Sequence, residues 1–357
     1  MVRWGVLQVN LPDLADVTTL SVSESCTTCV GMTIMNGSGM DVSTRSVACV
    51  EVLRQWCGDL EADRLVRVFS TWGQLLVAAD NRHLSGTTAD PELLPRRHLA
   101  ACGLLERMDA LTRYDSRFPQ QILELRRPPA LVYIHGQWVP DTTLVSVVGA
   151  QTASPVGVEI ARNTALSAAA AGVGIVARTD TLLGRTALLE TLRAGGYAVG
   201  IRVPGFAVSS AQDAVSGQVL DSGGALFYGS PPSTGFTPSA FQTANALTVG
   251  LGHAVLVAEI GMQSDADTFT VSTAVHACKY LIVASYGSHR VSGRYVPDSM
   301  LGCDILATPG AFSPTYFGTN ERIDSRVAAA GPAADAVVST GDEIAAVLTS
   351  ISGHQRT

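Results

Sequence analysis

The chain has 357 residues, of which 46% are hydrophobic and only 15% are charged, so it is long enough for more than one domain and too apolar for a disordered protein. Its 24 basic and 31 acidic residues give a net charge of −7, which argues against a protein whose whole surface binds nucleic-acid phosphate. The longest apolar run, Leu166–Ala177, is too short to cross a bilayer and Met1–Asn10 lacks the features of a secretory signal, so we expect a cytoplasmic protein without membrane contact.

The first third of the chain gives the least information about its fold. Residues 1–58 show no pattern to which a fold can be assigned. Their pair Cys26 and Cys29 is interpreted as reduced thiols, because the other cysteines there lack the spacing of a second zinc-binding pair. Residues 59–112 are rich in Leu, Ala and Arg at helix-like spacing, which predicts a small, mostly helical domain.

Short apolar runs alternate with longer helical segments over the next part of the chain. Several of the runs are apolar on both faces, as strands of a parallel sheet covered by helices are. The pattern predicts a doubly wound α/β domain with a mainly parallel sheet. The expected strands are Leu144–Val148, Gly174–Ala177, Tyr197–Val203, Ala225–Tyr228, Ala254–Glu259 and Tyr280–Ala284, and the expected helices are Pro155–Ala171, Thr181–Ala194, Ala207–Asp221, Pro238–Leu251, Val271–Lys279 and, at the end, Thr340–Ser350.

A turn rich in small residues, Gly149–Ser154, joins the first of these strands to its helix. Ser154 is placed to cap that helix and Pro155 suits its first position. Such a turn directs backbone amides and the positive end of a helix toward an anion, which favours a nucleotide or nucleic-acid contact. Neither a dinucleotide-binding nor a P-loop glycine pattern occurs at this turn, so a hydride-transferring enzyme and a P-loop nucleotidase are both poorly supported.

A series of further motifs surrounds this turn. In chain order they are Tyr114–Leu123, Pro128–Gly136, Val147–Gly149 with Ser154 and Gly157, Phe241–Gly252, Ala254–Thr270 and Gly318–Asn320. In order and spacing they resemble the DprA/Smf family of the SLOG superfamily, which shows Tyr-Pro-x-x-Leu, Pro-Pro-x-x-Leu-Tyr-x-x-Gly, Val-Gly-Ser-Arg-x-x-Ser-x-x-Gly, Phe-Pro-x-Arg-Asn-Arg and Gly-Thr-Asn. The resemblance covers residues 113–352 and implies a Rossmann-like domain there.

The chain departs from the family at positions that would contact phosphate. Gln151 stands where the family has the arginine of its Gly-Ser-Arg turn, and Ala244 and Ala246 stand where two arginines would flank Asn245. A neutral side chain cannot replace a charged guanidinium fork on phosphate. We therefore expect weak DNA binding by the isolated protein, and stronger binding if arginine replaces Gln151 and Ala244.

The strand ends and the resemblance together predict one binding cleft, because ligands of open α/β sheets bind at the carboxyl ends of the strands. Asp265 and Asp267 could bind a divalent cation together with Glu259, which stands at the end of a predicted strand. A solvated acidic loop is the favoured interpretation, and no metal or cofactor is expected. The aromatic residues form no cluster in the sequence. The expected ligand-binding residues, for nucleotide or DNA phosphate, are Gly149, Gln151, Ser154, Gly157, Arg178, Asn245, Ser264 and Thr270.

The resemblance implies a protein that binds single-stranded DNA, forms homodimers and assists a RecA-type recombinase in DNA uptake or recombination. It implies no catalytic activity. The Pro-Gly-Gly-x-Gly-Thr-x-x-Glu loop of the related nucleotide hydrolases is missing, since Gly318–Asn320 has neither the glycine pair nor the glutamate. Two alternatives stay open: a sensor of a small nucleotide-derived molecule, and a scaffold that keeps the fold for dimerisation or partner docking.

Overall fold

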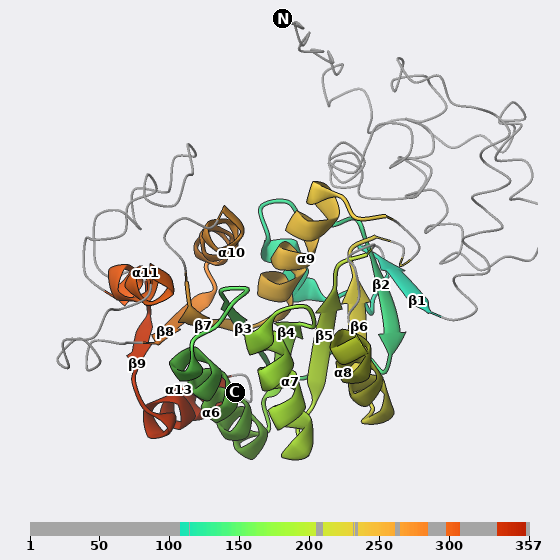
Figure 1. Ribbon diagram of the computed structural model, residues 1–357. Coiled ribbons are helices and arrows are strands. Elements are labelled where there is room, and N and C mark those ends of the chain that lie inside the picture. The colour runs from blue at the N-terminus through green and yellow to red at the C-terminus, as the bar shows by residue number, and fades with distance from the viewer. Residues whose placement is uncertain are drawn as a thin grey trace, which may run out of the picture. The chain divides into compact units, whose positions relative to one another are not determined.

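The computed structural model describes residues 108–113, 115–204, 210–230, 232, 235–260, 265–284, 298–307 and 334–354 (Figure 1). The predictions for residues 1–58 and for the helical domain up to residue 107 lie outside this part of the chain, and so does the predicted site residue Ser264.

One nine-stranded sheet runs through the described residues in the order β1-β2-β6-β5-β4-β3-β7-β8-β9. Its strands from β6 to β9 in that order pair in parallel, whereas β2 pairs antiparallel with both β1 and β6. The predicted doubly wound, mainly parallel α/β fold is confirmed. The strands are β1 (Asp109–Thr112), β2 (Leu131–Gly136), β3 (Leu144–Gly149), β4 (Gly174–Arg178), β5 (Ala198–Arg202), β6 (Ala225–Tyr228), β7 (Ala254–Glu259), β8 (Tyr280–Ala284) and β9 (Ala336–Val338).

Helices cover both faces of the sheet (Figure 1). One face carries α6 (Pro155–Ala171), α7 (Leu182–Arg193), α8 (Ser210–Asp221) and α13 (Gly341–His354), and the other carries α9 (Pro238–Leu251), α10 (Asp265–His276) and α11 (Asp298–Ala307). A 3-10 helix, η2 (Gln120–Glu124), packs against α9. Among the helices of the described residues, none is long and apolar enough to cross a bilayer.

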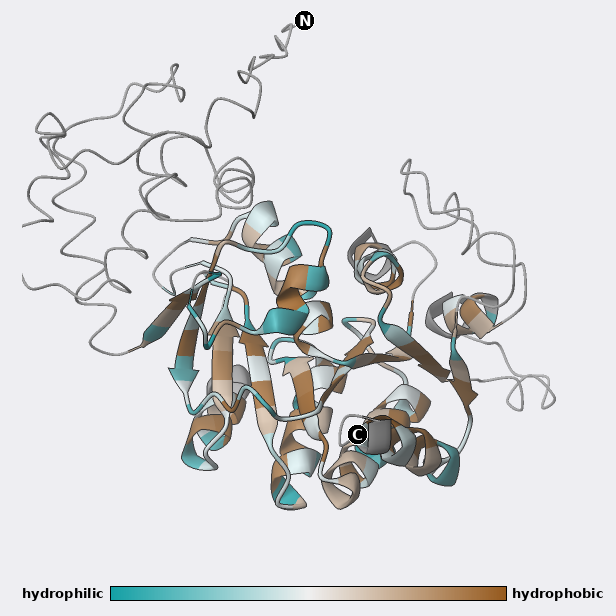
Figure 2. Ribbon diagram, turned by 180° about the vertical axis from the view of Figure 1, so that it is seen from behind, coloured by the Kyte–Doolittle hydropathy of each residue, from teal (hydrophilic) through white to brown (hydrophobic). Residues whose placement is uncertain are grey.

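The central strands are buried on both faces, which explains why their sequences do not alternate between apolar and polar residues. Every residue of β7 is buried, and the strands are coloured mostly hydrophobic in Figure 2. On α6, Ala161, Ala165 and Ala168 have no exposed surface. These short side chains let the helix lie close to the sheet and to its neighbours α7 and α13.

The helix starts follow the capping signals in the sequence. The Ser154 hydroxyl accepts the N–H of Gly157 at 3.1 Å, and Pro155 occupies the first position of α6, as predicted. At the start of α13, Glu343 accepts the N–H of Thr340 while its own N–H bonds the Thr340 hydroxyl, which confirms the predicted capping box.

The antiparallel edge of the sheet was not predicted. Strand β1 lies inside segment 59–112, for which the sequence predicts helices, and it pairs residue by residue with β2. The sheet therefore begins at Asp109, before the domain boundary placed at residue 113.

A partly buried polar network lies at the amino ends of β3 and β7. His253 Nδ1 accepts the N–H of Leu144 at 3.0 Å, and His253 Nε2 lies 3.0 Å from the side-chain amide of Gln121. Lys279, the one lysine of the chain, has a side chain only 3% exposed and donates to Glu124 at 2.6 Å. These bonds attach η2 to the amino ends of the strands.

The strand order fixes where a ligand can bind. From β3 the chain passes through α6 to β4 on one side, and from β6 it passes through α9 to β7 on the other side of β3. The connections thus diverge between β3 and β7. In open α/β sheets the space outside the carboxyl ends of two such strands is the usual ligand site.

Candidate ligand-binding cleft

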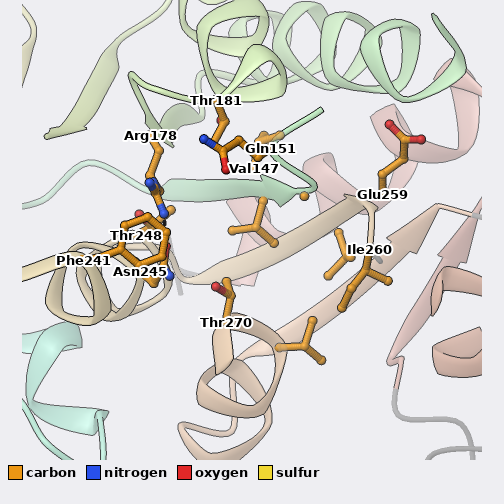
Figure 3. Close-up of a pocket in the computed structure, with 14 residues that line it drawn as sticks. Val147, Gln151, Arg178, Thr181, Phe241, Asn245, Thr248, Glu259, Ile260 and Thr270 are labelled. Carbon is orange, nitrogen blue, oxygen red and sulfur yellow. Dashed lines mark hydrogen bonds between the residues drawn. The ribbon is translucent and has the colours of Figure 1, made fainter. Parts of the chain in front are cut away.

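A cleft of about 620 Å³, open solvent included, lies at the carboxyl ends of β3 and β7. Strands β3, β4 and β7 form its floor and helices α9 and α10 contribute side chains across from them (Figure 3). We call it the switch-point cleft. Its lining residues are Val147, Val148, Gly149, Gln151, Arg178, Thr181, Phe241, Asn245, Thr248, Val257, Glu259, Ile260, Thr270 and Val271.

The structure brings most of the predicted site residues together here. Gly149, Gln151, Arg178, Asn245 and Thr270 all line the switch-point cleft, although they come from four separate segments of the chain. The other two described candidates are at the start of α6 and are not among the lining residues; they are Ser154 and Gly157.

Arg178, at the end of β4, is held on three sides. Its Nε donates to Asp180 Oδ1 at 2.8 Å and its Nη2 forms an ion pair with the other oxygen of the same carboxylate. Its Nη1 donates to Asn245 Oδ1 at 2.5 Å, and its guanidinium carbon lies 4.2 Å from the centre of the Phe241 ring. Arg178 is only 9% exposed, so water screens its charge little, and the carboxylate of Asp180 provides most of the balancing negative charge.

Asn245 presents a buried donor to the cleft. The residue is only 3% exposed, and its side-chain oxygen accepts a hydrogen bond from Arg178. Its Nδ2 has no hydrogen-bond partner among the described residues. A buried N–H without a hydrogen bond destabilises the folded protein by about 1–3 kcal/mol. A ligand with an acceptor atom for this N–H would therefore gain binding free energy.

The start of α6 is occupied by a carboxylate of the chain itself. Glu259, at the end of β7, has no exposed surface, and its Oε2 accepts the N–H of Ser154 at 2.7 Å. A methyl group at Gly157 would lie 2.2 Å from the same oxygen, so only glycine leaves room for the carboxylate. The negative charge suits the helix dipole, but it takes the position in which we expected an external anion.

At Gly149, as at Gly157, neighbouring atoms leave no room for a Cβ atom. A Cβ atom there would lie 2.4 Å from Leu183 Cδ1 and 2.8 Å from the carbonyl oxygen of Glu259. The N–H of Ala150 donates to that same carbonyl at 3.0 Å. This glycine thus lets β3 and β7 meet α7 at the floor of the cleft.

An aromatic pair lies beside Arg178, contrary to the expectation that the aromatic residues form no cluster. The rings of Phe236 and Phe241 are 6.3 Å apart in an edge-to-face arrangement, and Phe236 is 48% exposed. Asp180 and this pair were missed as parts of the site. The available signals were the spacing of two between Asp180 and Arg178, which puts both on one side of an extended segment, and the position of both phenylalanines around the start of α9.

The burial of Ala244 argues against an arginine at this position as a contact to DNA. Ala244 has no exposed surface and points into the core, so an arginine there would be buried away from the switch-point cleft. Gln151 is exposed and lines the cleft, so it is the position where added charge would reach a ligand.

The described residues contain no group of three or more His, Cys, Asp or Glu placed to hold a metal ion. Glu259 ends β7, at the strand end where the sequence predicts it, and is buried against the start of α6. The side chains of Asp265 and Asp267 lie outside the described ones.

Comparison with known proteins agrees with the fold and with the motifs. The family model described as DNA recombination-mediator protein A matches residues 109–339. The structure of DprA from Streptococcus pneumoniae is similar with a TM-score of 0.61 and 16% identity over 86% of this chain and 98% of that one. DprA from Helicobacter pylori, whose structure was described for its single-stranded DNA binding mode, gives a TM-score of 0.46 and 15% identity over 56% of this chain and 86% of that one. The comparison with curated proteins found no match. The chain belongs to the DNA recombination-mediator protein A family.

Proposed function

We propose that the protein binds single-stranded DNA and that the switch-point cleft is its binding site. The family to which the chain belongs consists of DNA-processing proteins, and the cleft lies where the fold favours ligands. The observation that carries the proposal is Asn245 Nδ2, which lies in the wall of this cleft next to Arg178 and has no hydrogen-bond partner in the part of the chain that the structure describes. Gly149, Gln151 and Thr270 complete the proposed contact surface.

Binding by the isolated protein should be weak. Among the described residues one arginine, Arg178, lines the cleft; it is paired with Asp180, and Gln151 offers no charge. Three other arginines of the described residues have partners of their own: Arg162 pairs with Glu190, Arg185 donates to the Asp180 carbonyl and Arg202 donates to Ser216. None of these three lines the cleft.

A titration of labelled oligonucleotide with the full chain tests the proposal. We expect fluorescence anisotropy to show binding of single strands with lower affinity for a duplex of the same sequence, and only a modest loss of affinity as salt is raised. The same affinity for duplex and single strand would contradict the proposal, as would the absence of binding at low salt. Nanomolar binding in moderate salt would show that a basic surface elsewhere holds the DNA.

We further propose that the protein acts as a homodimer with a RecA-type recombinase in DNA uptake or recombination. This part rests on the family resemblance. Analytical ultracentrifugation should give a dimer, and assembly of recombinase filaments on single strands should be faster when the protein is present. A monomer at all concentrations, or no change in filament assembly, would contradict the respective claim.

A sensor of a small nucleotide-derived molecule is the second candidate. The compensated charge of Arg178 favours it, because a cleft without net positive charge suits a neutral or weakly charged ligand. Stabilisation of the protein by mononucleotides in a thermal melt, without binding of oligonucleotides, would support this candidate over DNA binding. Binding of neither would favour a scaffold. We expect no hydrolysis of nucleoside monophosphates in any of these experiments.

A further inference from the structure

We propose that Arg126 and Arg127 form a second contact surface for single-stranded DNA, outside the switch-point cleft. The two residues, which we call the arginine pair, lie between η2 and β2. They bind backbone phosphates of a strand that leaves the cleft along α9. The inference rests on the proposed binding of single-stranded DNA and adds a surface at a distance from the cleft.

The acidic side chains nearest to the arginine pair in the sequence are bonded to other basic residues. The segment from β1 to β2 contains three of them, Asp109, Asp115 and Glu124. Glu124 accepts a hydrogen bond from Lys279 at 2.6 Å, and Asp109 and Asp115 both form ion pairs with Arg117. Because these carboxylates are matched by other cations, the arginine pair adds net positive charge to this surface.

The chain presents both arginines to solvent between two anchored positions. Arg126 and Arg127 are exposed, whereas Leu125 before them and Pro128 after them are buried. Leu125 packs on α9, since its Cδ1 lies 2.7 Å from the position that a Cβ atom of Gly250 would take. Proline also restricts the backbone of the residue before it. Binding of a phosphate therefore orders little more than the two side chains, which lowers its entropic cost.

Helix α9 connects the arginine pair to the switch-point cleft. Asn245 on this helix lines the cleft. Gly250, against which Leu125 packs, follows on the same helix at a distance of about 7.5 Å along the axis. In Figure 1 the teal segment that precedes β2 lies beside α9. A strand of several nucleotides that leaves the cleft along α9 therefore reaches the arginine pair.

Two adjacent guanidinium groups suit the backbone of a nucleic-acid strand, because each can bind a phosphate through two parallel hydrogen bonds. Inside the cleft Arg178 is paired with Asp180, so the phosphates of a bound strand gain more from cations outside it. The exposed side chains of Arg162 and Arg193 share the carboxylate of Glu190 on the other face of the sheet. The arginine pair, beside α9, is better placed to bind the strand.

The experiment removes both charges in the full chain and measures how DNA binding depends on salt. For Arg126→Gln/Arg127→Gln and a labelled single strand of about 16 nucleotides, we expect the affinity to fall about tenfold at low salt. The slope of log affinity against log salt should become shallower by about 1.4, since each phosphate contact on a single strand contributes about 0.7. A strand of about 4 nucleotides, which enters the cleft and ends before the arginine pair, should bind the wild type and the variant equally.

Arg162→Gln/Arg193→Gln is the matched control. It removes the same charge from exposed positions on α6 and α7, on the other face of the sheet, and should change neither the affinity nor the slope. Arg127→Gln alone should give about half the change in slope, or about 0.7. This single variant keeps the test decisive if the double variant folds poorly, which circular dichroism would show.

The outcomes separate this inference from the function on which it rests. An unchanged slope for the long strand would overturn the inference, leave DNA binding by the cleft intact and favour an acidic protein as the partner of the arginine pair. Equal losses in the control variant would show an effect of net charge and would also overturn it. Equal weakening of the short and the long strand would place the contact in the cleft, contrary to the inference. If the wild type binds neither strand, DNA binding itself is wrong and this inference with it.

Discussion

Asp180 controls the charge of the switch-point cleft through Arg178. Arg178 ends β4 and Asp180 lies in the turn that follows, and both side chains are nearly buried, so the ion pair is shielded from salt. A buried arginine with such a partner orders its neighbours Asn245 and Phe241 without giving the cleft a net positive charge. The charge available to DNA therefore depends on single residues around the cleft.

Replacing Asp180 with asparagine should release this charge. Asp180→Asn keeps an acceptor for Arg178 and removes the negative charge, so we expect single-stranded DNA to bind more tightly at low salt. The salt dependence should steepen by about the amount that one phosphate contact contributes. Oligonucleotide titrations at several salt concentrations measure both quantities. Asp221→Asn, an equal change of charge at the exposed end of α8, serves as control; an unchanged affinity for Asp180→Asn would show that Arg178 does not face the DNA.

Adding an arginine at Gln151 should act in the same direction. Gln151→Arg places a guanidinium fork on an exposed part of the cleft lining, and we expect a gain of about 1 kcal/mol, or roughly fivefold in affinity, with a steeper salt dependence. Gln218→Arg makes the same substitution on exposed α8 and should have much less effect. If both variants gain equally, the effect is one of net charge and the cleft has no special role.

At the scale of the elements, the carboxyl end of β7 and the start of α6 depend on each other. Glu259 caps the helix from outside its own sequence, and Gly157 leaves the space for the carboxylate. This contact joins two segments about 100 residues apart, and it fixes the turn Gly149–Ser154 that borders the switch-point cleft.

Gly157→Ala should therefore destabilise the protein. The added methyl group would overlap with the Glu259 carboxylate, so we expect a loss of about 1–3 kcal/mol in the free energy of unfolding. Urea denaturation followed by circular dichroism measures it. Gly217→Ala on α8 is the matched control, since nothing lies within 4 Å of a Cβ there and alanine favours a helix. Equal stability of the two variants would show that α6 moves to accommodate the methyl group.

The sequence predicted the central elements well because their signals are local. Runs that are apolar on both faces marked the parallel strands, and Ser154 and Pro155 marked the start of α6. β1 was not predicted because it is an edge strand of only four residues, and its formation depends on pairing with β2. A local sequence pattern contains no information about that pairing. For α10 the prediction Val271–Lys279 was shifted, since Asp265 and Asp267 mark the helix start and Cys278, at a φ of 51°, ends it.

Local signals also explain why the location of the candidate site was predicted but several of its contacts were not. Strand ends and the Gly149 turn follow from the order of elements, so the location of the cleft was predictable. The pairing of Arg178 with Asp180, the contact of Glu259 with Ser154 and the burial of Ala244 depend on three-dimensional packing. No pattern in the sequence indicates which side chains of a helix contact which strand.

On the scale of the whole molecule, the two ends of the sheet have different roles. The carboxyl ends form the switch-point cleft, whereas the amino ends hold the partly buried network of His253, Gln121, Glu124 and Lys279. Burial, together with the nearby charge of Lys279, lowers the pKa of His253 below its ordinary value of 6.5. Neutral His253 accepts the N–H of Leu144, so protonation would break a bond between β3 and β7.

His253 should make the stability of the protein depend on pH. Its pKa is lower in the folded than in the unfolded state, so its contribution is complete above about pH 6.5 and is lost as the pH falls toward the folded pKa. We expect the urea midpoint to fall from about pH 7 to about pH 5, and His253→Asn to remove part of this fall. His135→Asn, at an exposed position of β2, should keep the full dependence. Identical pH profiles for wild type and His253→Asn would contradict the assignment.

The buried lysine has a practical consequence for solution studies. An amine-reactive reagent finds one lysine side chain in this sequence, and in the folded state it is covered and bonded to Glu124. Labelling of Lys279 then requires the amino edge of the sheet to separate from η2. The rate at which the Lys279 amine is modified would therefore measure how often η2 separates from the amino ends of the strands, at the end of the sheet opposite the switch-point cleft.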